Sequence, residues 1–523
     1  NSGASRNQPG GDRMGCCATT EEGQPKLSKQ KSLPNEGGLH TQLLKENKSA
    51  SVWEKYKKGK LLGAGMTGAV HVGIHRDTGV RYAIKSINKR KLDPAQLGEL
   101  KNEVALLRIL DHPSIVRLYE VYELPNRMYL VMQLLEGKDL GQVRFNTERQ
   151  VAKVMRKIVH AIGYCHSKGV VHRDIKLENF VFTSVDNLED VIVIDFGIGK
   201  KTVAGDLKVE ITESKATQKR NMKTVCGTPY YMSPQVLDGR YDQKCDCWAI
   251  GVLAFILLTS RPPFNGRYKR ELDNRIRAGV VQYPNSMSVN ARNFISNLLK
   301  VDARQRWTCQ QALQSDWMKN VQLADVKSFE IEKDTLEKMI QFQQAGRLKK
   351  MALMIRAFTD TSKRVQKLKA TFDSLDTTGT GTLTHPELKE ALVRHKINLD
   401  SKTVFDALDV DKRGEISYTE FLAATMGDEL QSDREILKGL FDSLDITKNG
   451  RITKKDLLKF LGSDAKKYDV EQLLGEGDET GNLEITFEEF VKMMERGPGE
   501  TPMSESARSK VSSVKALSDD VRE

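Results

Sequence analysis

The chain has 523 residues, which at about 150 residues per domain allows three to four domains. Charged residues make up 29% and hydrophobic residues 39% of the chain, which excludes wholesale disorder and a fibrous repeat. The charge is uneven: residues 366–496 carry a net charge of −8 and the rest of the chain carries +20. We therefore expect an acidic module joined to a basic body. No nucleic-acid-binding motif accompanies the basic residues, so we expect no nucleic-acid partner.

Two further features of the composition bear on the compartment. The chain has 7 cysteines and no CxxC pair, too few for a disulfide framework, which favours a reducing, cytoplasmic location. The longest apolar run, residues 247–258, has 12 residues, whereas a transmembrane helix needs about 20. We expect this run to form a buried helix, and we expect neither a transmembrane segment nor a secretory signal.

The patterns change several times along the chain. The successive regions are a polar segment expected to be disordered (1–50), a mixed domain (56–318), a helical linker (321–365), a helical domain with an internal repeat (366–496) and a flexible tail (497–523). Regular structure is predicted to begin near residues 53–56. In the mixed domain, short β-type runs precede longer helical patterns, which predicts a small sheet lobe followed by a helical lobe; the runs are 68–73, 81–87 and 128–132.

The repeat consists of four twelve-residue stretches, each opened by an aspartate, with spacings of 33, 36 and 33 residues. The stretches are 376–387, 409–420, 445–456 and 478–489. Each carries Leu or Ile at its eighth position and a carboxylate at its twelfth. Phe372, Phe405 and Phe441 lie four residues before their opening aspartates, where an amphipathic entering helix would bury them. Four such units in two pairs are similar to the EF-hand array of calmodulin.

Calcium takes six to eight oxygen ligands, which an EF-hand supplies from positions one, three, five, seven, nine and twelve. The candidate ligands are Asp376, Thr378, Thr380, Thr382, Glu387, Asp409, Asp411, Glu415, Glu420, Asp445, Thr447, Asn449, Arg451, Asp456, Asp478, Thr480, Asn482, Glu484 and Glu489.

Each loop departs from a full ligand set. The first is low in charge, and the second has Arg413 at position five. The third closes with Asp456, one methylene shorter than Glu, and the fourth has Leu483 where a turn glycine is usual. A leucine at positive φ costs about 1–2 kcal/mol. We therefore expect weak calcium binding, with half-activation near 10⁻⁵ M, about the upper end of the sensor range.

Two motifs in the mixed domain point to phosphate chemistry. A glycine-rich loop, Gly63-Ala-Gly65-Met-Thr-Gly68-Ala-Val70, is followed by Tyr82-Ala-Ile-Lys85. Glycines let the backbone approach phosphates, and Lys85 would neutralise the α- and β-phosphates. No helix follows in the position that a dinucleotide-binding fold requires, so that fold is disfavoured.

The more specific motif is His172-Arg-Asp174-Ile-Lys176-Leu-Glu-Asn179, followed by Asp195-Phe-Gly197. Phosphoryl transfer needs a hydroxyl acceptor, charge neutralisation and positioned metal ions. Asp174 would face the attacking hydroxyl and Lys176 the γ-phosphate, and Asn179 and Asp195 would hold magnesium.

With these motifs in view, residues 56–318 resemble a eukaryotic protein kinase of the calmodulin-kinase type. With residues 321–496 added, the chain resembles the calcium-dependent protein kinases of plants and protists. The resemblance implies an α+β, two-lobed kinase fold followed by an all-α, calmodulin-like domain. It implies a calcium-regulated serine/threonine kinase that uses ATP, Mg²⁺ and Ca²⁺, autoinhibited by its junction and activated through its own EF-hands.

The resemblance also implies roles for individual residues. Glu103 pairs with Lys85, Asp246 anchors the catalytic loop, and four side chains stack as the spine of the active form: Leu107, Leu118, His172 and Phe196. Asp139 and Glu178 would hold a substrate arginine, which favours basic substrates. The nucleotide-binding residues are Leu62, Gly63, Gly65, Gly68, Val70, Ala83, Lys85, Met132, Gln133, Leu135, Asp139, Glu178, Asn179 and Asp195.

The chain departs from the family pattern after the catalytic motifs. Ser233-Pro234-Gln235 stands where the family has Ala-Pro-Glu, whose glutamate pairs with an arginine matched here by Arg306. Glutamine leaves that charge uncompensated, which would cost about 1–3 kcal/mol. Residues 200–222 are polar and are expected to form a mobile insertion. Thr224 matches a phosphorylation position of related kinases, and a plain loop threonine is the alternative.

The linker helix carries basic residues around an apolar face. Leu348, Met351, Ile355 and Phe358 recur at intervals of three and four residues, as in helices that a calmodulin-like groove binds. Residues 347–352 also resemble a basic phosphorylation site without its Ser or Thr, so they would suit a pseudosubstrate. A helix packed permanently on the kinase is the alternative. For the whole chain, the alternatives are a calcium-responsive pseudokinase scaffold and a kinase with purely structural EF-hands.

Near the N-terminus, Met14-Gly15-Cys16-Cys17 matches a myristoylation start with two adjacent cysteines for palmitoylation. Two acyl groups, aided by nearby lysines, would anchor the protein stably at the cytoplasmic face of a membrane. This prediction requires that translation begins at Met14, and it fails if residues 1–13 belong to the native protein.

Overall fold

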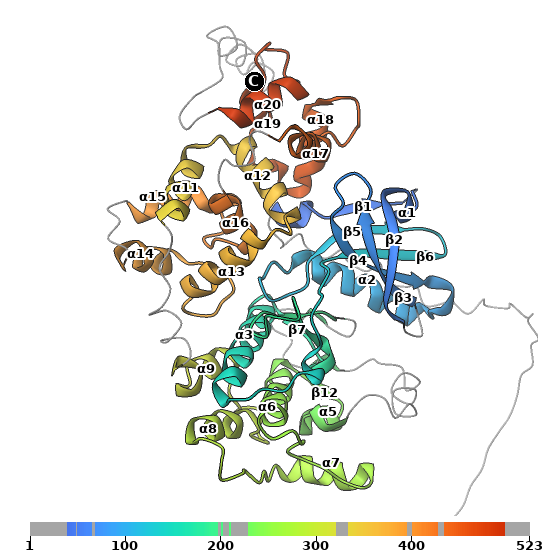
Figure 1. Ribbon diagram of the computed structural model, residues 1–523, viewed down its shortest axis with the longest axis vertical. Coiled ribbons are helices and arrows are strands. Elements are labelled where there is room, and N and C mark those ends of the chain that lie inside the picture. The colour runs from blue at the N-terminus through green and yellow to red at the C-terminus, as the bar shows by residue number, and fades with distance from the viewer. Residues whose placement is uncertain are drawn as a thin grey trace, which may run out of the picture. The chain divides into compact units, whose positions relative to one another are not determined.

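The computed structural model of the protein (Figure 1) describes residues 39–48, 50–64, 68–196, 200–201, 209–210, 229–320, 333–394, 400–426 and 433–496. Gly65, Gly197, Thr224 and the acylation motif therefore lie outside the described residues, as does nearly all of the segment 200–222. Among the described helices, none combines the length and the apolar character that crossing a bilayer requires.

A six-stranded sheet forms the first lobe. Its strands are β1 (Lys45–Asn47), β2 (Tyr56–Ala64), β3 (Gly68–His75), β4 (Arg81–Asn88), β5 (Leu118–Glu123) and β6 (Arg127–Met132), in the order β1-β5-β6-β4-β3-β2. The strands β2 to β6 pair antiparallel, and β1 runs parallel to β5. The three predicted β-type runs are confirmed as β3, β4 and β6.

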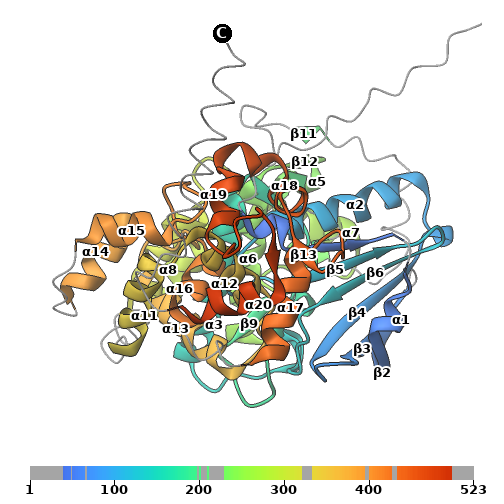
Figure 2. The same cartoon turned by 90° about the horizontal axis from the view of Figure 1, so that it is seen from above.

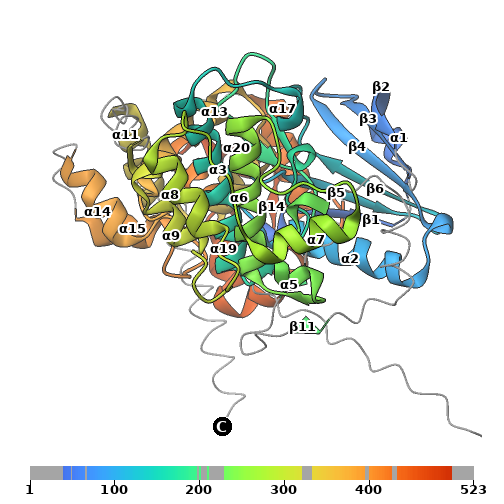
Figure 3. The same cartoon turned by 90° about the horizontal axis from the view of Figure 1, so that it is seen from below.

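The side chains of β6 alternate between two apolar clusters on opposite faces of the sheet. Met128 and Leu130 join the main core with α2 (Pro94–Ile109), whereas Tyr129 and Val131 pack with Val52 of α1 (Val52–Lys55). Figures 2 and 3, which view the molecule from opposite sides, both show α2 along one face of the sheet. An aspartate N-cap and a proline in its first turn start α2.

The prediction that residues 1–50 are disordered is wrong for the described part of that segment. A 3₁₀ turn, η1 (Leu39–Gln42), precedes β1. Leu43 and Leu44 are buried, and β1 adds to the sheet edge by main-chain pairing with β5. Main-chain pairing requires no apolar periodicity in a three-residue strand, so the sequence carries no signal for it.

The second lobe of the mixed domain is helical. Its helices are α3 (Glu148–Ser167), α5 (Pro234–Leu237), α6 (Gln243–Thr259), α7 (Lys269–Ala278), α8 (Val289–Leu298) and α9 (Cys309–Leu313). Its short strands are β7 (Val170–Val171), β8 (Phe180–Phe182), β9 (Val191–Val193), β10 (Lys200–Lys201), β11 (Val209–Glu210) and β12 (Arg240–Tyr241), which pair as β7–β10, β8–β9 and β11–β12. Short 3₁₀ turns also occur: η2 (Lys89–Lys91) connects β4 to α2 in the first lobe, and the second lobe contains η3 (Leu140–Gln142), η4 (Leu177–Asn179) and η5 (Pro229–Tyr231).

Helix α6 confirms the prediction of a buried helix at the longest apolar run. Every side chain from Cys245 to Phe255 is buried, and the Trp248 ring stacks on Phe264 with centroids 5.5 Å apart. Figure 3 shows α8 beside α6. Because α6 lies at the centre of this lobe, residues at its N-terminal end can hold the loops around them.

The last region is mainly helical. Its helices are α11 (Lys333–Gln344), α12 (Arg347–Thr359), α13 (Lys363–Leu375), α14 (His385–Arg394), α15 (Ser401–Leu408), α16 (Tyr418–Met426), α17 (Arg434–Leu444), α18 (Lys454–Leu461), α19 (Val470–Gly475) and α20 (Phe487–Glu495). The remaining elements are the 3₁₀ turn η7 (Gly462–Lys467) and the strands β13 (Arg451–Ile452) and β14 (Ile485–Thr486).

The eighth residues of the four loops join them in two pairs, as the repeat predicted. Leu383 and Ile416 exchange backbone hydrogen bonds of 2.9 and 2.8 Å, and Ile452 lies opposite Ile485 in the β13–β14 pair. The three predicted helix-end phenylalanines are buried: Phe372, Phe405 and Phe441.

Candidate active site and calcium loops

The first pair of site residues joins the sheet to α2. Lys85 lies on β4, and its Nζ is 2.8 Å from Oε1 of the buried Glu103 on α2. Burial alone would lower the pKa of Lys85, but the carboxylates of Glu103 and Asp195 outweigh it and raise that pKa above its ordinary value. Lys85 is therefore held as a cation beside two acidic groups, as phosphate neutralisation requires.

Asp246, in the first turn of α6, holds the backbone of the catalytic loop. Its carboxylate accepts hydrogen bonds from the backbone N–H groups of His172 and Arg173, both at 2.9 Å, and lies 2.8 Å from Nε2 of His166. Burial would raise the pKa of Asp246, but the hydrogen bond and charge of His166 lower it. Arg173 has φ +71°, a left-handed conformation that these two hydrogen bonds hold in place.

Three motif residues meet at the loop itself. Asn179 donates from Nδ2 to the Asp174 carbonyl at 2.7 Å and to Asp174 Oδ2 at 2.9 Å, and Lys176 Nζ binds the same carboxylate oxygen. The four residues expected to stack are also brought together. Leu107, Leu118 and Phe196 belong to one buried cluster, and the Phe196 ring lies 4.8 Å from that of His172.

Several of the predicted nucleotide-binding residues lie on the strands around Lys85. Val70 on β3 is opposite Lys85, and Ala83 on β4 is opposite Met132 at the end of β6. Leu62 and Gly63 lie on β2, and Gln133 and Leu135 continue the chain after β6. Gly68 has a structural requirement of its own, because an added Cβ would lie 1.7 Å from the Ser86 carbonyl oxygen.

The two residues expected to bind a substrate arginine have different surroundings. Asp139 caps η3 by accepting the Gly141 N–H at 3.0 Å through Oδ1, and its Oδ2 accepts a hydrogen bond from Gln142 Nε2, so both of its oxygens already have partners. Glu178, on η4, is exposed.

The calcium loops bury their carboxylates. The residues at positions one and twelve of all four loops are buried: Asp376, Glu387, Asp409, Glu420, Asp445, Asp456, Asp478 and Glu489. Carboxylates buried in groups are costly unless a cation compensates them. In the second loop, oxygens of Asp409, Asp411 and Glu420 lie within 4.8 Å of one another. Burial and the charge of Asp411 raise the pKa of Glu420 well above its ordinary value. The donor sets therefore fit Ca²⁺.

The structure contains the predicted departures of individual loops from a full EF-hand ligand set. Arg413 binds Asp411, with Nε 3.0 Å from Oδ2, so calcium entry into the second loop requires this guanidinium to move. Leu483 has φ +57°, as predicted for the position where the other loops have Gly381, Gly414 and Gly450. The Leu483 N–H still donates to Asp478 Oδ2 at 2.7 Å. Asp456 accepts the N–H groups of Thr447 and Thr453 at 2.7 and 3.0 Å.

The remaining predicted ligands lie in the same loops. At position seven, Thr382 donates from Oγ1 to Glu415 at 3.0 Å, and Arg451 pairs with Glu484 at 3.1 Å. These contacts link the two loops of each pair. The polar side chains at positions three and five lie in the loop turns: Thr378, Thr380, Thr447, Asn449, Thr480 and Asn482.

Comparison with known proteins identifies both halves of the chain. The protein kinase domain family matches residues 56–318, and the EF-hand domain pair family matches residues 365–426 and 434–495. Calcium-dependent protein kinase 5 of Plasmodium falciparum (isolate 3D7) is 34% identical over 472 residues, which cover 86% of this chain and 79% of that protein. The chain belongs to the calcium-dependent protein kinases.

Plant relatives extend this match. Calcium-dependent protein kinase 9 of Arabidopsis thaliana is 33% identical over 470 residues, covering 86% of this chain and 83% of its own length. Calcium-dependent protein kinase 14 of the same plant is 32% identical over 508 residues, which cover 92% of this chain and 93% of that protein. The protein is a calcium-regulated serine/threonine protein kinase that uses ATP and Mg²⁺, and its EF-hands bind Ca²⁺. The predicted family, α+β fold class and cofactors are confirmed.

In this calcium-dependent protein kinase, the described part of the junction contains the helices α11 and α12. The predicted apolar face of α12 is buried in one cluster with EF-hand residues, through Leu348, Met351, Ile355 and Phe358. Glu476 caps the start of α12 by accepting the N–H groups of Arg347 and Leu348 at 3.0 and 2.7 Å. Burial among apolar groups lowers the pKa of Lys350 to about 8.

Contacts between the kinase domain and the first EF-hand pair were missed by the sequence reasoning. Asp111 accepts hydrogen bonds from the N–H and Oγ1 of Thr419, at 2.8 and 2.9 Å, at the start of α16. The buried Lys369 binds Asp190, and Nε2 of His160 lies 3.4 Å from Asp376, the first residue of the first calcium loop. Each pair joins residues far apart in the sequence. Asp376 and Thr419 lie in calcium loops, but no motif marks their kinase-domain partners His160 and Asp111.

Proposed function

We propose that this kinase transfers the γ-phosphate of ATP to Ser or Thr residues preceded by basic residues, with Asp174 accepting the hydroxyl proton. The observation that carries this assignment is the hydrogen-bonded group of Asp174, Lys176 and Asn179, on a loop whose backbone is held by Asp246. Lys176 would neutralise charge on the transferred phosphoryl group. Asn179 and Asp195 are the residues that would hold Mg²⁺, which would supply charge neutralisation for the phosphates.

The positions of Lys85 and Glu103 support phosphate binding by a competent active site. Their 2.8 Å ion pair orients the Lys85 ammonium at the strand surface where Val70 and Ala83 also lie. A pseudokinase scaffold has no need of this pair together with Asp174, Asn179 and Asp195, so catalysis is the better supported function.

Preference for basic substrates rests on two carboxylates. Glu178 is exposed, whereas both oxygens of Asp139 already accept hydrogen bonds, from the Gly141 N–H and from Gln142 Nε2. A carboxylate binds a guanidinium through two parallel hydrogen bonds, which favours arginine over lysine. We infer that a substrate with arginine three residues before its Ser or Thr is preferred, and that Glu178→Gln weakens this preference more than Asp139→Asn does.

Regulation is proposed to run through the junction. Without calcium, residues 347–352 would occupy the substrate groove as a pseudosubstrate; with calcium, the EF-hands would hold α12 instead. The burial of the apolar face of α12 among EF-hand residues supports the second half of this cycle.

The test is phosphorylation of a peptide with arginine three residues before serine, with calcium and with chelator. We expect activity only with calcium, and a matched peptide with glutamate in place of the arginine should react poorly. Truncation after residue 320 should give calcium-independent activity. An inactive truncated kinase would make the junction a required brace and contradict the pseudosubstrate. No activity in the full chain under any condition would favour the scaffold.

To test the junction, Lys349 and Lys350 should be substituted one at a time. Lys350 is buried and donates to the carbonyls of Gln343 and Ala407 at 3.2 Å, so Lys350→Glu would disturb EF-hand packing as well as any groove contact. Lys349 binds the Arg496 carbonyl at 2.8 Å and is less buried. Lys349→Glu is therefore the cleaner variant, and it should raise activity in chelator.

Membrane attachment is proposed for chains whose translation begins at Met14. Myristoylation of Gly15 and palmitoylation of Cys16 or Cys17 would give the two acyl groups that stable anchoring needs. Gly15→Ala should release the protein from membranes, and Ser32→Ala serves as a matched control. Retention of the Gly15→Ala protein on membranes would contradict acylation.

A further inference from the structure

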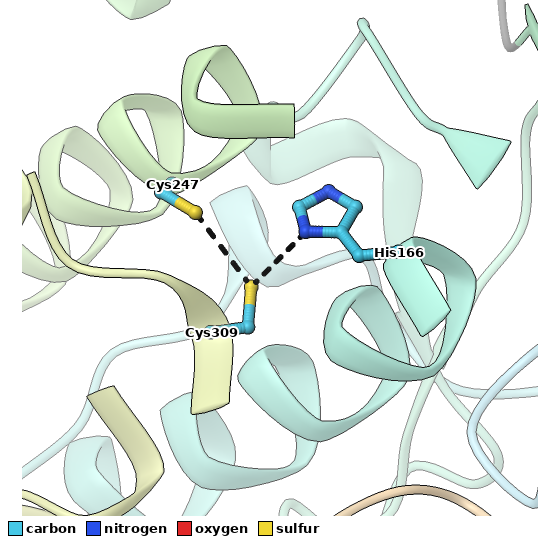
Figure 4. A group of neighbouring side chains, drawn as sticks. All are labelled: His166, Cys247 and Cys309. Carbon is cyan, nitrogen blue, oxygen red and sulfur yellow. Dashed lines mark hydrogen bonds between the residues drawn. The ribbon is translucent and has the colours of Figure 1, made fainter. Parts of the chain in front are cut away.

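Two thiols and one imidazole, from three different helices, lie together near Asp246, the residue that binds the backbone of the catalytic loop. His166 is in the last turn of α3, Cys247 is in the first half of α6, and Cys309 opens α9. Cys309 Sγ lies 3.7 Å from His166 Nδ1 and 3.9 Å from Cys247 Sγ, and the three atoms all lie within 4.8 Å of one another. Figure 4 shows the two thiols and the imidazole pointing toward one another.

The cluster is closed to solvent. Cys247 and Cys309 are 1% and 2% exposed, and the His166 side chain is 9% exposed. The catalytic chemistry does not use either cysteine. Thiolate and imidazole are the side-chain ligands that zinc takes in proteins.

The second nitrogen of His166 is already held in the manner of a metal ligand. Its Nε2 lies 2.8 Å from Asp246 Oδ2, which leaves Nδ1 directed at the cysteines. A histidine that binds a metal through one nitrogen usually donates the other N–H to a carboxylate, which fixes its tautomer and ring orientation. The same Asp246 carboxylate anchors the backbone of His172 and Arg173.

We propose that His166, Cys247 and Cys309 form a binding site for a thiophilic divalent cation of the zinc class. Zinc binds sulfur at about 2.3 Å and imidazole nitrogen at about 2.0–2.1 Å, so tetrahedral ligands lie about 3.8 Å apart for two sulfurs and about 3.6 Å for sulfur and nitrogen. The observed 3.9 and 3.7 Å match these separations. The cation would replace both thiol protons, which leave to solvent, and a water molecule would fill the fourth position.

The charge balance also fits a dication. Two thiolates and one divalent cation are neutral together, so the site adds no net charge to the interior beside the Asp246 carboxylate. A disulfide between the same cysteines fits less well. It would need the sulfurs to approach from 3.9 Å to about 2.05 Å, in a site that excludes dissolved oxidants.

A bound cation would tie α3, α6 and α9 together and fix the ring of His166. Because His166 holds Asp246 and Asp246 holds the catalytic loop, the ion would act as a structural support for the loop. This function is independent of the calcium switch, since the ligands are sulfur and nitrogen rather than the oxygens that calcium takes.

The test uses Co²⁺ as a spectroscopic substitute for zinc in the full chain, with calcium present. We expect a thiolate-to-cobalt charge-transfer band in the near ultraviolet, which disappears when one equivalent of Zn²⁺ is added. Cobalt in the EF-hands gives no such band, because their ligands are oxygens. Zn²⁺ should also raise the melting temperature of the parent by several degrees.

Variants assign the band to these residues. Cys247→Ser and Cys309→Ser should each abolish it, whereas Cys245→Ser, which changes another buried cysteine of α6, should retain it. Since serine in the core can impair folding, a second measurement uses the parent alone in moderate urea, which opens buried thiols to a reagent: Zn²⁺ should slow the alkylation of Cys247 and Cys309, and not that of Cys245. A parent without the band, or a band that survives both variants, would overturn the site. Mass spectrometry showing Cys247 linked to Cys309 in the untreated chain would assign a disulfide instead.

Discussion

Arg306 donates a hydrogen bond from Nη2 to Oε1 of Gln235 over 2.7 Å, in an interior where Arg306 is 1% exposed. The same guanidinium donates to the Lys300 and Lys244 carbonyls and lies 5.0 Å from the Trp248 ring. Burial lowers the pKa of Arg306. The glutamine therefore supplies the geometry of the family's glutamate but not its charge.

Gln235→Glu should convert this hydrogen bond into a buried, charge-assisted pair. We expect the kinase domain to gain about 1–3 kcal/mol in free energy of unfolding, because the buried guanidinium acquires a counter-charge. The measurement is the urea midpoint of the kinase transition in calcium, with Gln235→Leu as the control that should lose stability. An unchanged midpoint in Gln235→Glu would mean that the surrounding carbonyls already compensate Arg306.

Asp174→Asn should lower turnover by several orders of magnitude and leave ATP affinity nearly unchanged, because other groups bind the nucleotide. Asparagine keeps the size of the side chain but cannot accept the hydroxyl proton. Peptide phosphorylation and ATP binding would be measured on the same preparation. Asp186→Asn, in an exposed loop, is the matched control. Normal turnover in Asp174→Asn would remove this residue from the mechanism.

Calcium activation should be half complete near 10⁻⁵ M free calcium, about the upper limit for a sensor. Glu387→Gln should impair activation most, since the first loop has an uninterrupted set of oxygen ligands. Activity would be titrated in calcium buffers, with Glu390→Gln, on the exposed side of α14, as the control. Half-activation below micromolar calcium, or full activity in chelator, would contradict this prediction.

Leu483→Gly should lower the free energy of unfolding only slightly, although Leu483 packs against the EF-hand core. Relief of the φ +57° conformation is worth about 1–2 kcal/mol and offsets the lost packing and the greater chain entropy of glycine. The comparison is Leu457→Ala, a fully buried position, which should cost about 2–5 kcal/mol. Equal losses in the calcium-bound proteins would show that Leu483 carries no strain.

The stability of the EF-hand and junction unit should rise between pH 8 and 10.5 through Lys350. The pKa of Lys350 is lowered from 10.5 to about 8 by burial, so over this range the unfolded chain binds the extra proton. Below pH 8 the cost of burying the charge is fully present, on the order of 3 kcal/mol at most. Lys350→Met should therefore differ most from the parent near pH 7 and least near pH 10.5. Denaturant unfolding across this pH range checks the trend, with the exposed-lysine variant Lys459→Met as baseline, and a constant difference would contradict it.

Short-range patterns determined most of what the sequence revealed. The catalytic motif and the calcium loops are contiguous stretches in which spacing sets much of the geometry, so Asp174 and Asn179 could be assigned to one catalytic loop from the sequence. The same holds for the positive φ of Leu483, which follows from its position in a twelve-residue loop. The buried helix α6 follows from its unbroken apolar run, because such a run has no favourable place in water.

Only the tertiary structure decided the contacts between distant segments. Cys247 and Cys309 are 62 residues apart, and Asp111 and Thr419 are 308 apart. Thr419 lies in the second calcium loop, but no motif marks Cys247, Cys309 or Asp111, because a cysteine in a core helix and an aspartate after a helix are ordinary residues. Strand β1 formed where disorder was predicted for the same reason: its main-chain bonds to β5 depend on a neighbour more than 70 residues away, and a local pattern contains no information about that neighbour.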